Sequence, residues 1–242
     1  MPAPPIREFV ENRVEPKVRG SLHFPDASNG NALVLTHGAG SNARAPLLMA
    51  LAETFAAAGF TVLRCDLPYR QTRSWGPPGP GDAARDRAGL KNAVEALRKL
   101  AADVPSLTHS QQQPAQSLAH EWKAIYLGGH SYGGRQSSML SAEEPDLVAG
   151  LLLLSYPLHP PRKPEQQRTQ HLPNLRTPAL FVHGTRDPFG SVAELEAALK
   201  MIPAKTRLVA VEGAGHDLGF KGKARREELP KEILNDFLEF HL

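Results

Sequence analysis

The sequence predicts an α/β protein built around a doubly wound, mostly parallel β-sheet. Short aliphatic runs without polar alternation recur along the chain, as expected of strands that are buried on both faces of a sheet. Amphipathic helical patterns separate these runs, and this alternation is typical of a sheet with right-handed helical crossovers. The chain has 242 residues, which is a common length for one domain of this class.

Six aliphatic runs are expected to form the parallel strands: residues 32–36, 61–65, 124–127, 151–154, 179–182 and 208–211. Helices are expected where apolar side chains recur on one helical face: residues 46–59, 90–101, 132–143 and 229–240. Residues 6–24 precede the first of these runs. They are expected to add one or two antiparallel strands at the edge of the sheet.

Three stretches interrupt this alternation. Residues 73–81 contain three prolines and three glycines, and residues 105–119 are polar and rich in glutamine. Residues 156–178 carry six prolines between two expected strands, and a loop of that length in a compact domain usually has a function. We expect this segment to fold over the ends of the strands as a small lid. Residues 1–242 are otherwise expected to form a single domain without a large cap.

The composition excludes several classes of protein. Cys65 is the only cysteine, which excludes an intramolecular disulfide and a cysteine-based zinc cluster. The longest apolar run, residues 148–154, is too short to cross a bilayer, and residues 1–9 lack the apolar stretch of a signal peptide. The formal net charge is +3, and the basic stretch 221–226 leads directly into two glutamates. We therefore expect a cytoplasmic monomer or homodimer that binds neither nucleic acid nor membranes.

The strongest chemical signal is the Gly-His-Ser-Tyr-Gly motif at residues 129–133. Its spacing alone is weak evidence, because serine and glycine are frequent in this chain. Its context is stronger, because the expected strand 124–127 ends just before it and an expected helix follows. A strand, a tight turn and a helix are the setting of a nucleophile elbow, which predicts Ser131 as a nucleophile. The alternative is a glycine-rich turn with an ordinary serine.

A serine hydroxyl becomes a good nucleophile only when a base removes its proton. In a chain with a nucleophile elbow of this kind, the expected order is serine, then acid, then histidine, each after its own strand. His216 follows the strand at 208–211, and Asp187 follows the strand at 179–182. Ser131, Asp187 and His216 are therefore predicted to form a catalytic triad, in which the carboxylate orients the imidazole.

Other side chains near these positions fit the triad less well. Asp66 follows an earlier strand and so lies outside the expected order, and Asp217 is adjacent to His216, so that their side chains diverge. His130 is expected to pack or to form hydrogen bonds within the turn. Cys65 is expected to be a small core residue.

An oxyanion that forms during catalysis needs backbone donors that are already in place. One is expected to be the amide of Tyr132, directly after the nucleophile. The other is expected to be the amide of Ala39, in the Thr-His-Gly-Ala-Gly stretch at residues 36–40 that ends the first long strand. A simple glycine turn between a strand and a helix explains the same glycines.

Taken together, these motifs resemble the α/β-hydrolase superfamily along nearly the whole chain. Within it, they resemble a small dienelactone-hydrolase-like group that includes the testis-expressed protein Tex-thirty and the third subunit of the NSL chromatin complex. The resemblance implies the same triad. Tyr132 stands where many members have methionine, and Ser131 stands where dienelactone hydrolases use cysteine, which argues against a dienelactone substrate. The segments that carry the resemblance are residues 35–40, 127–135, 154–161, 183–189 and 213–216.

The substrate pocket is expected at the carboxyl ends of the parallel strands. Arg70, Trp75, Tyr156 and His159 are expected to bind substrate there, because guanidinium groups beside aromatic rings suit an anionic acyl group. The alternative is that the arginines are ordinary surface residues. A pocket built from short loops favours small or medium esters.

The resulting hypothesis is a serine hydrolase that cleaves small or medium carboxylic esters or thioesters through an acyl-enzyme on Ser131. A small-molecule ester is the expected partner. No metal or organic cofactor is expected, because the sequence has no ligand cluster or phosphate-binding glycine loop. Two alternatives remain: a scaffold or interaction protein with little turnover, and an acyltransferase or peroxidase that uses the same site.

Overall fold

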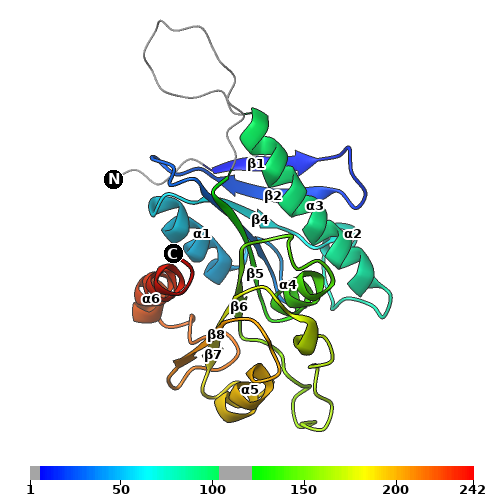
Figure 1. Cartoon of the computed structure of the whole chain (residues 1–242), viewed down its shortest axis with the longest axis vertical. Helices are drawn as coiled ribbons and strands as arrows, with labels where there is room; N and C mark the ends of the chain where they lie inside the picture. The colour runs from blue at the N-terminus through cyan, green and yellow to red at the C-terminus, as the bar shows by residue number, and fades with distance from the viewer. Residues whose placement is uncertain (1–5, 104–121) are drawn as a thin grey trace, which may run out of the picture.

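In the described residues, 6–103 and 122–242, eight strands form one central sheet (Figure 1). The strand order in this computed structural model is β1-β2-β4-β3-β5-β6-β7-β8. The glutamine-rich stretch 105–119 and residues 1–5 lie outside the described residues. The strands are β1 (Ile6–Glu11), β2 (Val18–His23), β3 (Asn31–Thr36), β4 (Thr61–Cys65), β5 (Ala124–His130), β6 (Gly150–Leu154), β7 (Ala179–Gly184) and β8 (Thr206–Val211).

The predicted fold class is confirmed by the strand directions. Strands β3 to β8 are parallel, whereas β1 pairs antiparallel with β2, and β2 with β4. All six predicted parallel strands are present, and β1 and β2 are the predicted antiparallel strands. Strand β5 extends past residue 127 because Gly128 pairs with both β3 and β6. The close approach requires glycine, since a Cβ there would lie 2.6 Å from the carbonyl oxygen of Leu152.

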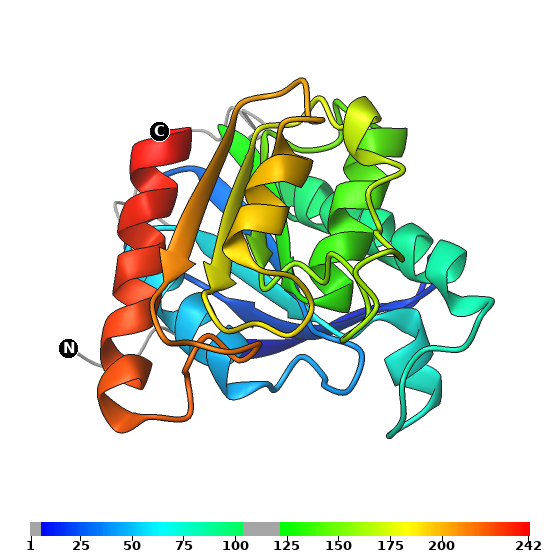
Figure 2. The same cartoon turned by 90° about the horizontal axis from the view of Figure 1, so that it is seen from below.

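Helices cover both faces of the sheet, and together they form a single domain (Figure 2). Side chains of α1 and α6 pack on one face, and side chains of α3, α4 and α5 pack on the other. None of the described helices has the length and hydropathy that a membrane span requires. The helices are α1 (Pro46–Ala57), α2 (Pro68–Thr72), α3 (Asp82–Asp103), α4 (Tyr132–Glu143), α5 (Val192–Leu199) and α6 (Lys223–His241), with a short 3-10 helix, η1 (Leu172–Asn174).

Helices α2 and α5 were not predicted from the sequence. A local signal for α5 is present, because Ser191 and Glu194 form a capping box at its start. The hydroxyl of Ser191 accepts from the backbone N–H of Glu194, and the Glu194 carboxylate accepts from the backbone N–H of Ser191. A serine followed three residues later by glutamate is a recognisable helix start.

The central strands contribute side chains to both faces of the sheet. On β3, Ala32 and Val34 pack toward α3 and α4, whereas Leu33 and Leu35 pack toward α1 and α6. All four are fully buried. This two-sided burial explains why the strand sequences show continuous aliphatic runs rather than alternation.

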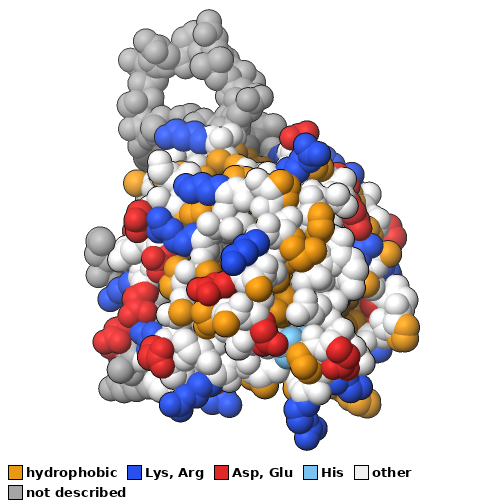
Figure 3. Space-filling model, turned by 60° about the horizontal axis from the view of Figure 1, so that its bottom comes forward, with side chains coloured by type: hydrophobic (Ala, Val, Ile, Leu, Met, Phe, Trp, Pro, Cys, Tyr) orange, Lys and Arg blue, Asp and Glu red, His pale blue; other side chains and the backbone are white. Residues whose placement is uncertain are grey.

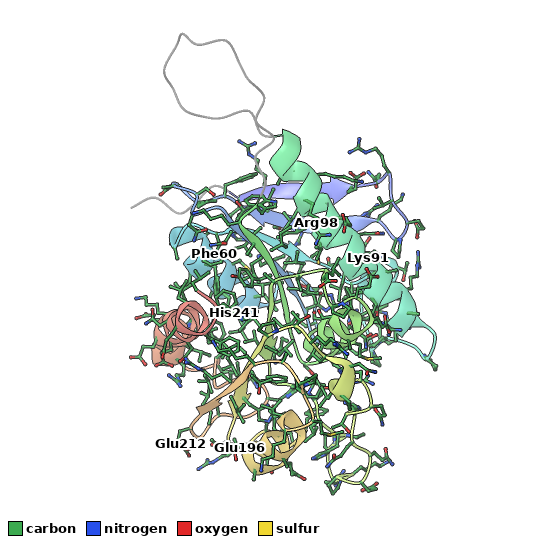
Figure 4. All side chains as sticks on the ribbon, in the orientation of Figure 1. Phe60, Lys91, Arg98, Glu196, Glu212 and His241 are labelled. Atoms are coloured by element: carbon green, nitrogen blue, oxygen red, sulfur yellow. The ribbon has the colours of Figure 1, made fainter. Side chains whose placement is uncertain are left out.

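An aromatic cluster joins α6 to the sheet. The ring of Phe237 lies 5.1 Å from that of Phe55 and 4.9 Å from that of Tyr126. Figure 4 shows Phe60 and His241 on this same side of the sheet. The His241 ring packs 5.2 Å from Tyr126, so that the end of the chain is held against the core.

An ion pair and a hydrogen bond connect α3 with the residues that directly follow α4. Lys91 and Arg98 lie on α3 (Figure 4). The Lys91 ammonium lies 2.8 Å from the Glu144 carboxylate, and the Arg98 guanidinium donates to the carbonyl oxygen of Leu147. Acidic and basic side chains are also interspersed over the face shown in Figure 3. Exposed pairs of this kind contribute at most about 1 kcal/mol each.

The proline-rich segment 156–178 is tied to its surroundings by hydrogen bonds. The Tyr156 hydroxyl donates to the carbonyl oxygen of Arg168 at 2.8 Å. The backbone N–H of His159 donates to the carbonyl oxygen of Phe189 at 3.0 Å. Leu172 of η1 is fully buried. A lid function for this segment stays a prediction.

Acid should destabilise the fold through four histidines. Burial lowers the pKa of each from its ordinary value of 6.5 to about 4. The unfolded chain therefore binds these protons at a higher pH than the folded chain does. Their contribution to stability is complete above pH 6.5 and is lost as the pH falls toward 4. The four are His23, His130, His171 and His241.

Urea unfolding at a series of pH values between about 7 and 5 measures this effect, since each additional proton bound on unfolding changes the free energy of unfolding by about 1.4 kcal/mol per pH unit. The His241→Gln variant should show a shallower pH dependence, because glutamine does not take up a proton in this range. Lys163→Gln, on the exposed surface, is the matched control and should retain the full dependence. An unchanged pH dependence in His241→Gln would contradict the assignment.

Candidate active site

Ser131 occupies a strained turn between β5 and α4. Its φ is +52°, in the left-handed region that residues other than glycine rarely adopt. The turn is tight: a Cβ on Gly129 would lie 2.9 Å from the backbone of Gly133, and a Cβ on Gly133 would lie 2.5 Å from the carbonyl oxygen of His37. The two motif glycines are therefore required by close backbone contacts, as in a nucleophile elbow.

Ser131, His216 and Asp187 form a chain of hydrogen bonds. His216 Nε2 lies 2.8 Å from Ser131 Oγ, and His216 Nδ1 lies 2.8 Å from Asp187 Oδ2. The other carboxylate oxygen of Asp187 accepts from the backbone N–H of Phe189 at 2.9 Å. Because the carboxylate accepts at Nδ1, the imidazole carries its proton there and presents the Nε2 lone pair to the serine hydroxyl.

The loop that carries His216 is held by His130, the residue before the nucleophile. His130 Nε2 donates to the carbonyl oxygen of His216 at 2.7 Å. Burial lowers the pKa of His130 to about 4, so the ring is neutral near neutral pH. The ring of Phe189 lies 4.3 Å from that of His216 on another side. His130 was expected to pack or to form hydrogen bonds within the turn, and its hydrogen-bond partner lies 86 residues away in the chain.

The structure brings Asp187 to His216, rather than either of the other two acids. The Asp66 carboxylate accepts from the backbone N–H of Ala43 at 2.7 Å. The Asp217 carboxylate accepts from the backbone N–H of Gly219 at 3.1 Å. Among the described residues, neither carboxylate has a hydrogen bond to His216.

A second serine–histidine pair lies farther along α4. Ser138 Oγ is 2.8 Å from His171 Nε2 and also donates to the carbonyl oxygen of Arg135. Ser138 is fully buried, and no carboxylate of the described chain bonds to His171. This pair lacks both the acid and the accessibility that a nucleophile requires.

The loop at residues 38–40 is oriented through its carbonyl oxygens. The oxygen of Gly38 accepts from His37 Nδ1 at 2.9 Å, and that of Ala39 accepts from the Tyr69 hydroxyl at 2.8 Å and from Arg70 Nη2 at 3.1 Å. A trans peptide places its N–H opposite its carbonyl. The bond to the Gly38 oxygen therefore fixes the direction of the Ala39 N–H.

The backbone amides of Ala39 and Tyr132 remain available as donors. Neither has a hydrogen-bond acceptor among the described residues, and Tyr132 is the first residue of α4, where an N–H has no partner within the helix. The two amides belong to segments in close contact, since a Cβ on Gly38 would lie 3.3 Å from Ser131 Cβ. This arrangement fits the expected oxyanion hole.

A family model described as an alpha/beta hydrolase domain matches residues 29–239. The match includes Ser131, Asp187 and His216. The chain belongs to the α/β-hydrolase family. The predicted superfamily is thus confirmed, whereas the narrower resemblance to the group of Tex-thirty and the NSL subunit stays a prediction.

Solved structures share the fold of this α/β hydrolase. A dienelactone hydrolase from Anabaena variabilis is 22% identical and matches with a TM-score of 0.70 over 100% of both chains. A serine hydrolase homologue from Coxiella burnetii is 15% identical, with a TM-score of 0.70 over 95% of this chain and 96% of that chain. A serine hydrolase without lid from Xanthomonas campestris is 14% identical, with a TM-score of 0.66 over 97% and 95%.

One curated sequence match is local. A stretch of 48 residues is 48% identical to part of polyketide synthase ThaQ from Burkholderia thailandensis. It covers 20% of this α/β hydrolase and only 2% of that synthase. The similarity therefore concerns one short segment of a much longer protein.

Two of the expected substrate-binding residues are structural in this α/β hydrolase. Arg70 is 8% exposed, and its guanidinium donates to the carbonyl oxygens of Ala39, Ser41 and Gly76. Tyr156 is 1% exposed, with its hydroxyl bonded inside the segment 156–178. The polar atoms of both side chains thus have partners within the protein, and a contact of either residue with substrate stays a prediction.

The other two expected substrate-binding residues differ strongly in exposure. His159 is 5% exposed and its Nδ1 donates to the carbonyl oxygen of Pro160 at 2.8 Å. Trp75 is 83% exposed. It lies on a loop whose two ends are joined by an ion pair between Arg73 and Asp82. Substrate binding by His159 or Trp75 stays a prediction.

The close contacts of the elbow predict the effect of an added methyl group. Gly133→Ala should destabilise the fold by about 1–3 kcal/mol, because the added Cβ would lie 2.5 Å from the backbone carbonyl oxygen of His37, directly after β3. Gly40→Ala is the matched control, since a Cβ there would have no neighbour within 4 Å. Urea unfolding measures both. Equal stability of the two variants would contradict the described packing of the turn.

Proposed function

We propose that this α/β hydrolase is a serine hydrolase that cleaves small or medium carboxylic esters or thioesters through an acyl-enzyme on Ser131. The single observation that carries the proposal is the hydrogen-bonded chain from Ser131 through His216 to Asp187, at 2.8 Å for each bond. This series of hydrogen bonds starts at a serine in a strained turn, beside two backbone amides that have no acceptor among the described residues. A nucleophile, an oriented base and oxyanion donors are the groups that acyl transfer requires.

In the first step, the Ser131 oxygen attacks the carbonyl carbon of the ester while His216 Nε2 takes the hydroxyl proton. The carbonyl oxygen becomes an oxyanion, and the amides of Ala39 and Tyr132 donate to it. His216 then gives the proton to the departing oxygen of an ester or sulfur of a thioester, which leaves as an alcohol or a thiol. The acyl group stays on Ser131. Asp187 stays ionised and stabilises the imidazolium that forms between these transfers.

In the second step, water replaces the alcohol. His216 Nε2 removes a proton from the water as its oxygen attacks the acyl carbon, and returns the proton to Ser131 Oγ as the acyl bond breaks. The products are a carboxylic acid and the regenerated serine. The side chain of His216 is 25% exposed, whereas that of Asp187 is fully buried. Water therefore has access to the base but not to the carboxylate that orients it.

Ser131→Ala should abolish ester hydrolysis, because loss of a triad nucleophile typically lowers turnover by about a millionfold. A fluorophosphonate probe should label the wild-type chain on Ser131 and leave Ser131→Ala unlabelled. Ser138→Ala is the matched control and should be labelled like wild type, since Ser138 is buried and lacks an acid. Absence of wild-type labelling would instead favour a scaffold without turnover, and products formed from added alcohol or peroxide would favour a transferase or peroxidase.

Asp187→Asn should lower kcat by about ten-thousandfold, because an amide favours the wrong imidazole tautomer while leaving the shape of the site unchanged. Asp146→Asn, an exposed aspartate just after α4, should retain normal rates. Rates with a chromogenic acetate ester measure both variants. Near-normal turnover in Asp187→Asn would contradict the assigned acid even if Ser131 proved essential.

A further inference from the structure

One buried carboxylate has no part in the proposed catalytic steps. Asp86, in the second turn of α3, is fully buried. It forms no ion pair with a basic side chain of the described residues, and its neighbour Arg85 pairs with Glu15 instead. Burial raises the pKa of Asp86 above its ordinary value. A carboxylate that is buried without a cation destabilises a fold unless hydrogen-bond donors satisfy both of its oxygens.

Both oxygens of Asp86 accept hydrogen bonds from tyrosines. Oδ2 accepts from the hydroxyl of Tyr132 at 2.8 Å, and Oδ1 accepts from the backbone N–H of Tyr69 at 3.0 Å. These tyrosines lie on α4 and α2, and α3 packs against both helices. Because both contacts come from donors, they suit the ionised carboxylate, which accepts and does not donate. Asp86 thus joins two segments that are far apart in the chain.

The contact with Tyr132 restrains the residue that follows the nucleophile. The backbone amide of Tyr132 is one of the two expected oxyanion donors, and the hydroxyl at the far end of its side chain is bonded to Asp86. The Tyr132 ring lies 6.0 Å from that of Tyr69, at an interplanar angle of 90°. Among the described residues, the Tyr132 hydroxyl bonds to Asp86 alone. Loss of the carboxylate would therefore leave this side chain without its anchor.

The contact with Tyr69 leads to the other expected donor. Asp86 holds the backbone of Tyr69, and the Tyr69 hydroxyl donates to the carbonyl oxygens of Ala39 at 2.8 Å and of Gly38 at 3.3 Å. The Gly38 carbonyl belongs to the same planar peptide as the Ala39 N–H. Tyr69 is only 1% exposed, so its ring is closely packed. A displacement of Tyr69 would therefore redirect the Ala39 N–H.

We propose that Asp86 is a positioning residue that holds the Tyr132 and Ala39 amides in the arrangement that an oxyanion requires. The inference rests on the proposed serine hydrolase function. Oxyanion donors are effective because they are in place before the negative charge develops. Asp86 is fully buried and acts through the two tyrosines rather than on the substrate. Its loss should therefore weaken stabilisation of the transition state and leave binding of the unreacted ester unchanged.

Asp86→Ala should lower kcat for p-nitrophenyl acetate by about tenfold to a hundredfold with little change in KM, because displaced donors lose less than the hundredfold or more lost on removal of a donor. Tyr132→Phe keeps the backbone amide and the ring, and should lower kcat by about tenfold. The matched controls are Glu95→Ala, an exposed carboxylate of α3 that pairs with Arg98, and Tyr126→Phe, a buried tyrosine on the opposite face of the sheet. Both controls should keep wild-type kinetics.

Two ketones separate positioning from a general loss of structure. Ser131 Oγ adds to the carbonyl carbon of 2,2,2-trifluoroacetophenone, its proton passes to His216, and the ketone oxygen becomes an anion that the two amides would bind. Acetophenone has a similar shape but is not activated for this addition. In Asp86→Ala, the inhibition constant of the trifluoro ketone should rise by the factor by which kcat/KM falls. The inhibition constant of acetophenone should stay the same.

The two single variants should not be additive. Because the Tyr132 hydroxyl acts through Asp86, the variant that combines Asp86→Ala with Tyr132→Phe should lose no more activity than Asp86→Ala alone. Kinetics of the double variant with p-nitrophenyl acetate measure this coupling. Additive losses would contradict a shared path through the carboxylate.

Wild-type kcat in folded Asp86→Ala or Tyr132→Phe would overturn the inference, and so would an equal loss of affinity for both ketones. Circular dichroism establishes folding, and Tyr132→Phe tests the same contact if Asp86→Ala is unfolded. Failure of the proposed function is distinguishable. In that case wild type neither cleaves p-nitrophenyl acetate nor reacts with the fluorophosphonate probe, whereas a wrong role for Asp86 leaves wild type and variant equally active.

Discussion

The backbone conformation of Ser131 is the constraint on which the rest of the site depends. A left-handed conformation at a residue other than glycine costs about 1–3 kcal/mol, so the surrounding structure must enforce it. Strand β5 is paired with β3 on one side and β6 on the other, and α4 packs on β5 and β6. These contacts confine the turn that joins β5 to α4. The glycines at 129 and 133 permit the contact with the end of β3. The same contact brings the loop at residues 38–40 next to the serine.

Buried neutral histidines hold the loops around this turn. His37 donates through Nδ1 to the carbonyl of Gly38 and accepts at Nε2 from the backbone N–H of Leu67. Burial lowers the pKa of His37 and of His130, which keeps both rings neutral and their donor and acceptor roles constant. His216 differs because its ring is partly exposed and faces the serine. The site thus separates histidines that fix the backbone from the one that is positioned to exchange protons.

The predicted fold class is confirmed, and the three residues predicted as a triad lie within hydrogen-bond distance of one another, while their catalytic role stays a prediction. The parallel strands were predictable because both of their faces are buried, which leaves continuous aliphatic runs in the sequence. The proximity of Ser131, Asp187 and His216 was predictable because each follows its own strand, and parallel strands bring their carboxyl ends to one edge of the sheet. The direction of the Arg70 side chain was not predictable by the same reasoning. Arg70 follows β4, but its guanidinium turns inward to the carbonyl oxygens of Ala39 and Ser41.

The sequence by itself determined the class of fold, the position of the elbow and the order of serine, acid and histidine. These features depend on local patterns: burial of consecutive residues, glycine beside a tight turn, and a polar residue after a strand. Only the tertiary structure decided which polar atoms bind one another and which stay available. His130 and His216 are 86 residues apart, and Tyr69 and Ala39 are 30 apart. Hydrogen-bond partners and cavities depend on how distant segments pack, and no local pattern records that.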